Sequence, residues 1–163
     1  MKGIIALMVY LFVGTVSFAS EPVTETLQLE QDFKLATVKS QKFSKSQVII
    51  FSANWCAPCV QMQETTLKDA ALIGYLNQNS VNTIIDIDSE EGYKMFSKFK
   101  VNVLPTIIVT DENGNEIARK KEFLTAENFQ KFVQLNSKSA DLKNKNVLAA
   151  NNSTSIQVAN LQT

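Results

Sequence analysis

Histidine is absent from this chain of 163 residues, and other residue types that often carry chemistry are scarce: there are two cysteines, one tryptophan and three prolines. Without imidazole, the chain lacks the usual general base and the commonest metal ligand, so any catalysis must depend on cysteine, carboxylate, lysine or tyrosine. Sixteen basic residues balance sixteen acidic ones, and the basic residues form no cluster. This charge pattern argues against a nucleic acid or an anionic membrane surface as the partner.

The N-terminal residues 1–19 have the pattern of a secretory signal peptide. Lys2 is followed by an apolar run from Ile4 to Val13 and then by small residues that end at Ala19. The apolar run is shorter than the roughly 20 residues of a membrane-spanning helix. We therefore expect cleavage near Ala19 and a periplasmic or secreted protein, with retention as an uncleaved anchor as the alternative.

Hydrophobic periodicity predicts one α/β domain over residues 20–136, in which a central mixed β-sheet is flanked by helices on both faces. A polar segment over residues 137–163, rich in asparagine, serine and lysine, is expected to be a disordered tail. Asp88 and Thr125 are the expected caps of two of the helices. The expected helices are Leu27 to Lys42, the cysteine motif to Lys68, Asp69 to Leu76, Asp88 to about Phe99 and Ala126 to Leu135; the expected strands are Gln47 to Ser52, Val81 to Ile87, Thr106 to Thr110 and Glu116 to Lys120.

Both cysteines lie in the hexapeptide NWCAPC, residues 54–59, which directly follows an expected strand. Pro58 suits the first turn of a helix, and cysteines three residues apart there lie on one face and can form a disulfide. The N-terminus of a helix stabilises a thiolate and can lower the pKa of a cysteine from about 8.5 to as low as about 3.5. We therefore expect Cys56 to be the exposed nucleophile and Cys59 to resolve the mixed disulfide that Cys56 forms.

The segment QVIIFSANWCAPC, residues 47–59, resembles the strand and active-site motif of the thioredoxin superfamily, including its W-C-x-P-C signature. The resemblance continues through DIDSEEGYKMFSKFKV, the VLPT of residues 103–106 and TDENGNEIARK, and covers about Leu27 to Leu135. It implies a thioredoxin fold and a dithiol that works without a cofactor or a metal. It also implies a cis bond before Pro105, a Leu104 backbone that pairs with an extended substrate, and a substrate-binding surface made of Trp55, Ala57, Pro58, Leu104 and Pro105.

Three positions depart from the family pattern. Ile50 stands where many thioredoxins have a buried aspartate beneath the second cysteine, and Ile84 stands at the position of a neighbouring lysine. Glu122 or Phe123 replaces a glycine that faces the substrate. We therefore expect Cys59 to lie in an apolar setting without a carboxylate to accept its proton, unless water or Asp86 serves.

The leading hypothesis is an extracytoplasmic thiol-disulfide oxidoreductase that reduces protein disulfides and contributes to cell redox homeostasis. Reduction is favoured because the Ala-Pro pair between the cysteines supplies no histidine to stabilise the Cys56 thiolate further. The alternatives are a disulfide oxidase or isomerase of the same fold, a CxxC module that binds Cu(I) or zinc, and a purely structural disulfide. The expected partners are protein thiols and disulfides as substrates and an unidentified membrane or soluble electron donor, with the protein itself a monomer.

Overall fold

The structure is a computed structural model that describes residues 25–30 and 32–137. The expected signal peptide and all of the expected C-terminal tail except Ser137 lie outside the described residues.

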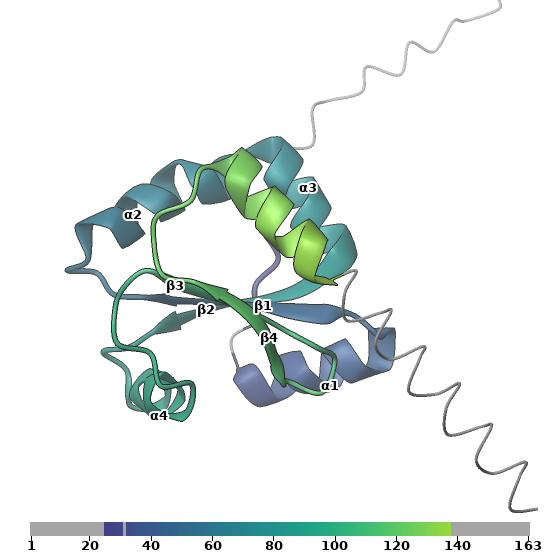
Figure 1. Ribbon diagram of the computed structural model, residues 1–163, viewed down its shortest axis with the longest axis horizontal. Coiled ribbons are helices and arrows are strands. Elements are labelled where there is room, and N and C mark those ends of the chain that lie inside the picture. The colour runs from purple at the N-terminus through teal and green to yellow at the C-terminus, as the bar shows by residue number, and fades with distance from the viewer. Residues whose placement is uncertain (1–24, 31, 138–163) are drawn as a thin grey trace, which may run out of the picture.

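A four-stranded mixed sheet forms the centre of the domain (Figure 1). Its strands are β1 (Ser46–Ser52), β2 (Ser80–Asp86), β3 (Thr106–Thr110) and β4 (Glu116–Lys120), in the order β2-β1-β3-β4. β1 is parallel to β2 and antiparallel to β3, and β4 is antiparallel to β3. Every residue of β1 and β3 is buried, which is the environment that continuous Val and Ile runs favour.

Helices cover both faces of this sheet. α2 (Ala57–Glu64), α3 (Ala70–Asn79) and a last helix over residues 126–137 lie on one face, and α1 (Phe33–Phe43) and α4 (Glu90–Lys98) lie on the other (Figure 1). A single 3₁₀ turn, η1 (Thr66–Lys68), connects α2 to α3. The predicted α/β architecture is therefore confirmed.

The alternation of side chains along β1 divides the core in two. Val48 and Ile50 belong to the apolar cluster that includes residues of α2, α3 and the last helix. Ile49 and Phe51 belong to a second cluster, which includes residues of α4. All four side chains are fully buried, and each such burial contributes about 1.5–3 kcal/mol to stability.

The first helix begins later than predicted. The expected helix started at Leu27, but Leu29 forms a parallel β-bridge with Asn82 at the outer edge of β2, and α1 begins only at Phe33. The Asp32 carboxylate caps α1 by accepting a hydrogen bond from the Lys34 N–H. Pairing with a distant strand overrode the helical spacing of the local sequence, because an edge strand offers unpaired backbone groups to a neighbouring segment.

Other expectations about the ends of helices were also wrong, and α3 continues to Asn79 beyond the expected end at Leu76. The helix that starts at the cysteine motif ends at Glu64 instead of continuing to Lys68, because the 3₁₀ turn η1 intervenes. The cap of α4 is Ser89 and not Asp88: the Ser89 hydroxyl accepts a hydrogen bond of 3.0 Å from the Gly92 N–H. The Asp88 side chain is thereby available for another contact.

Candidate active site

The cysteine pair lies where β1 passes into α2. Cys56 is the N-cap residue of α2, and its carbonyl oxygen accepts hydrogen bonds from the N–H groups of Cys59 and Val60, at 2.9 and 3.0 Å. Pro58 occupies the first turn of this helix, where its missing N–H leaves no hydrogen bond unmade. Cys56 and Cys59 form a disulfide with a Cα–Cα distance of 5.2 Å.

Cys56 is more enclosed than the sequence suggested, whereas the burial of Cys59 agrees with its expected apolar setting. The expected exposure of Cys56 is wrong in degree, since 6% of this residue is exposed, against 0% of Cys59. The two cysteines pack against Ala53, Ile87 and Leu104. Of the two, Cys56 is the one with a part of its surface exposed.

The register of the sheet brings a distant loop to the cysteines. β3 runs antiparallel to β1 and pairs Thr106 with Phe51, so the residues before β3 meet the residues after β1. The Leu104-Pro105 peptide bond in this loop is cis, as the resemblance implied, and Pro105 is buried.

A shallow groove of about 450 Å³ opens beside the disulfide. Of the residues proposed from the sequence, Trp55, Cys56, Ala57, Pro58 and Leu104 line it, whereas Cys59 and Pro105 do not. The sequence did not indicate four further lining residues: Ile87, Phe96, Asn102 and Val103. Of these four, Val103 could have been identified as a lining residue from the sequence, because it belongs to the VLPT motif and directly precedes Leu104.

Trp55 lies at the rim of this groove and not in the core, with 68% of the residue exposed. Its indole N–H donates hydrogen bonds to both carboxylate oxygens of Asp88, at 2.8 Å to Oδ2 and 3.1 Å to Oδ1. Asp88 was expected only as a helix cap. The contact with Trp55 could have been expected from the position of Asp88 just after β2. Parallel strands such as β1 and β2 end at the same edge of the sheet, so the residues that follow them lie close together.

The side of the site that faces the sheet combines apolar and polar residues. Ile50 is fully buried and pairs in register with Ile84, so the family's acidic and basic positions are both occupied by apolar side chains. Next to them, the Gln63 amide Nε2 donates a 2.8 Å hydrogen bond to the Ser52 hydroxyl. Asp86 pairs with Ser52 across the sheet but is exposed, and its Oδ1 accepts a hydrogen bond from the Asp88 N–H.

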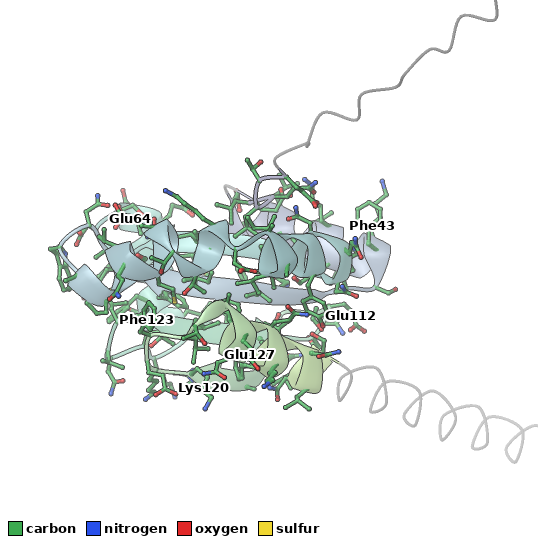
Figure 2. The ribbon with its side chains drawn as sticks, turned by 90° about the horizontal axis from the view of Figure 1, so that it is seen from above. Phe43, Glu64, Glu112, Lys120, Phe123 and Glu127 are labelled. Carbon is green, nitrogen blue, oxygen red and sulfur yellow. A yellow bond between two sulfur atoms is a disulfide. The ribbon has the colours of Figure 1, made fainter. Side chains whose placement is uncertain are left out.

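Of the two residues considered for the position of the family's glycine, Glu122 is exposed and Phe123 is half-buried. Seen from above, Phe123 lies at the same end of the molecule as Glu64 of α2, and Phe43 and Glu112 lie at the opposite end (Figure 2).

Within residues 25–30 and 32–137, no three His, Cys, Asp or Glu side chains are grouped so that they could hold a metal ion. In the same part of the chain, no helix has the length and apolar character needed to cross a bilayer.

Residues 29–136 match the family model of the thioredoxin-like domain. The chain belongs to this family. Among its relatives are the thiol:disulfide interchange proteins DsbD of Haemophilus ducreyi, 31% identical over 121 residues, and of Colwellia psychrerythraea, 29% identical over 117 residues. These alignments cover 71% and 69% of this chain but only 20% and 18% of the relatives, so the chain spans about a fifth of their length.

Solved structures show the same fold. A DsbH oxidoreductase aligns with a TM-score of 0.61 and 21% identity over 71% of this chain and 91% of its own. The C-terminal domain of Neisseria meningitidis DsbD in its oxidised form aligns with a TM-score of 0.56 and 19% identity over 67% of this chain and 99% of its own. Residues 29–136 thus form a thioredoxin-like domain that carries the Cys56–Cys59 disulfide at the N-terminus of α2.

Proposed function

We propose that this protein reduces disulfides of other proteins outside the cytoplasm, with Cys56 as the attacking residue and Cys59 as the resolving residue. The observation that carries this proposal is the unequal placement of the two sulfur atoms. Cys56 lines the groove at the N-terminus of α2, whereas Cys59 is fully buried within the first turn. The unpaired N–H groups at a helix N-terminus lower the pKa of a thiol, which favours Cys56 as the thiolate.

The reaction consists of two exchanges. The Cys56 thiolate attacks one sulfur of a substrate disulfide, forming a mixed disulfide and releasing the other substrate sulfur as a thiolate. The Cys59 thiolate then attacks the Cys56 sulfur, and the bond between Cys56 and the substrate breaks. The substrate gains two electrons, and the protein is left with the Cys56–Cys59 disulfide that the structure contains.

The groove supports an extended, apolar substrate segment. Leu104, at the cis-proline loop, offers its backbone for pairing with such a segment, as in strand addition at a sheet edge. Trp55 and Val103 provide apolar contact surface because 68% and 42% of these residues are exposed. Ala57 and Pro58 complete the lining of the proposed binding surface, and the buried Pro105, which does not line the groove, contributes through the cis bond that follows Leu104.

An extracytoplasmic location is supported by the signal-like residues 1–19, with cleavage near Ala19 and a domain over residues 20–136. The similarity to the DsbD proteins supports thiol-disulfide interchange with other proteins. A monomer that reduces disulfides in this location needs an electron donor, either a membrane protein or a soluble one, to restore the dithiol. N-terminal sequencing of the exported protein should return a residue near Ser20, and an intact Met1 in the membrane fraction would contradict cleavage.

Trapping with single-cysteine variants tests the assigned roles. Cys59→Ser should accumulate mixed disulfides with substrate proteins because nothing resolves them, and Cys56→Ser should accumulate none and lose turnover. Non-reducing electrophoresis separates these adducts, and the double variant serves as the background control. Equal trapping by both single variants would contradict the roles.

The reduction potential decides between a reductant and an oxidase or isomerase. We expect a value near the roughly −270 mV of thioredoxin and far from the roughly −120 mV of the strongest oxidant. Equilibration with glutathione buffers measures it, and a potential above about −170 mV would reverse the direction. A chelator should leave the activity unchanged, whereas a metal-binding module would release its metal.

A further inference from the structure

The hydrogen bond between Gln63 and Ser52 lies on the side of α2 that carries the resolving cysteine. Gln63 follows Cys59 by four residues, and residues four apart are neighbours on one face of a helix. Helical side chains also lean toward the helix N-terminus, over the preceding turn. Gln63 therefore lies on the same face of α2 as Cys59, one turn further along, and its Nε2 is held at 2.8 Å from the hydroxyl of Ser52, a residue with 3% exposure at the end of β1.

Cys59 has few other sources of polar stabilisation. The residue is fully buried, and the residues that pack with the cysteine pair, Ala53, Ile87 and Leu104, are apolar. Ile50, which the resemblance aligns with the acid that many family members carry beneath the second cysteine, is itself apolar and fully buried. Burial among apolar groups raises the pKa of a thiol, so without a hydrogen-bond donor Cys59 would be largely protonated near neutral pH and would attack slowly.

We propose that Gln63 is a further catalytic residue that donates a hydrogen bond to the Cys59 thiolate once the disulfide has opened, and that Ser52 is its positioning residue. A glutamine amide carries two N–H donors on one nitrogen. One donor is engaged by the Ser52 hydroxyl, which fixes the amide, and the second remains for the sulfur of Cys59. The assignment of Cys59 to the resolving step rests on the proposed function, but the effect on its pKa does not.

The hydrogen bond acts in the second exchange. The Cys59 thiol loses its proton to water, and the amide N–H of Gln63 stabilises the negative charge on the sulfur. This sulfur forms a bond to the Cys56 sulfur as the bond from Cys56 to the substrate breaks, and the departing substrate thiolate takes up a proton from water. Gln63 itself gains and loses no proton, since an amide does not titrate in this range.

Titration of Cys59 tests the hydrogen bond without any substrate. In a full-length Cys56→Ser chain, the ultraviolet absorbance of the thiolate reports the pKa of Cys59. Gln63→Met keeps the length of the side chain and removes the donor, and it should raise this pKa by about one unit, a tenfold change in the ionisation equilibrium. The matched control is Gln61→Met, a change of the same residue type on the exposed side of α2, which should leave the pKa of Cys59 unchanged.

A double-variant cycle on the pKa of Cys59 shows whether Ser52 acts by positioning Gln63 or affects Cys59 independently. Ser52→Ala should raise the pKa of Cys59 by less than Gln63→Met, and the double variant should show no more than the effect of Gln63→Met alone, because Ser52 acts through the amide. Additive shifts would overturn the role of Ser52.

Kinetics supply the second readout. In the chain with both cysteines, Gln63→Met should slow the decay of a mixed disulfide with glutathione about three- to fourfold near neutral pH, because the tenfold smaller thiolate fraction is partly offset by the greater nucleophilicity of the less acidic thiol. At a pH above the raised pKa the same variant should decay about threefold faster than the wild-type protein. A folded Gln63→Met protein with the wild-type Cys59 pKa and decay rate would overturn the inference, as would a loss of stability without a shift of this pKa. Failure of the wild-type protein to exchange with any disulfide would instead refute the proposed function, and the titration would still decide the inference.

Discussion

Replacing Ile50 with aspartate restores the acid that many thioredoxins carry and should strongly destabilise this protein. Ile50 lies in the middle of the central strand β1, is fully buried, and pairs with Ile84 on one side and Ile107 on the other. Shortening a buried isoleucine costs about 2–5 kcal/mol, and burying an unpaired polar group adds about 1–3 kcal/mol. The expected loss, on the order of 3–8 kcal/mol, is a large part of the roughly 5–15 kcal/mol that stabilises a typical domain.

The destabilisation should also depend on pH, and its sign follows from the burial. An apolar environment disfavours the carboxylate, so the pKa of Asp at position 50 is raised in the folded state above its unfolded value of about 3.9. Above this value the unfolded chain releases a proton that the folded chain retains. The free energy of unfolding should therefore fall with rising pH, by up to about 1.4 kcal/mol per pH unit, until the raised pKa is reached.

Urea denaturation over a series of pH values measures both parts, with Ile50→Asn as the matched control. The asparagine variant loses similar packing and buries a group of similar shape but does not titrate, so the difference between the variants isolates the carboxyl group. An osmolyte that favours the folded state keeps both proteins measurable if they unfold in buffer. Ile50→Val, with an expected loss of about 0.5–1.5 kcal/mol, calibrates the packing contribution.

A constant difference between Ile50→Asp and Ile50→Asn at all pH values would refute the reasoning, because it would mean that the carboxyl group ionises as easily in the folded protein as in the unfolded chain. The same variant tests the role of the missing acid in catalysis. If the introduced carboxyl group accepts the Cys59 proton, the decay of the mixed disulfide should be faster near neutral pH than in the wild-type protein.

Two further predictions concern the first turn of α4 and the segment before it. Gly92→Ala should destabilise the protein by about 1–3 kcal/mol or more, because the added Cβ would lie 1.8 Å from the Asp86 carbonyl oxygen. In contrast, Gly74→Ala in α3, whose Cβ would meet nothing closer than 3.7 Å, should be neutral or stabilise it by up to about 1 kcal/mol, and equal urea midpoints of the two variants would contradict this contrast. Asp88→Ala should free the indole of Trp55, the only tryptophan, and lower its fluorescence anisotropy while changing the free energy of unfolding by less than about 1.5 kcal/mol. An unchanged anisotropy would show that Asp88 does not hold the ring.

The sequence by itself determined the architecture and the chemistry of this protein. Apolar runs of strand length identified β1, β2 and β3 to within about one residue, because buried strands between two helical layers need apolar side chains on both faces. The turn after β3 and the short segment that returns from it identified β4. The spacing of Cys56 and Cys59 at the start of a helix indicated a disulfide that opens and closes, since this geometry is local and depends on few other residues.

The tertiary structure decided which residues surround the disulfide and how far it is enclosed. The bridge of Leu29 to Asn82, the contact of Trp55 with Asp88 and the hydrogen bond of Gln63 to Ser52 join residues from different elements, over 11 to 53 positions of sequence. These contacts depend on how the strands align and how the helices pack on them. Such pairings leave no periodic signal in the sequence, because many polar residues could make them and only the register of the folded sheet selects the pair. The burial of Cys56 has the same origin, since Ile87 and Leu104 reach it from β-sheet connections that the local motif does not contain.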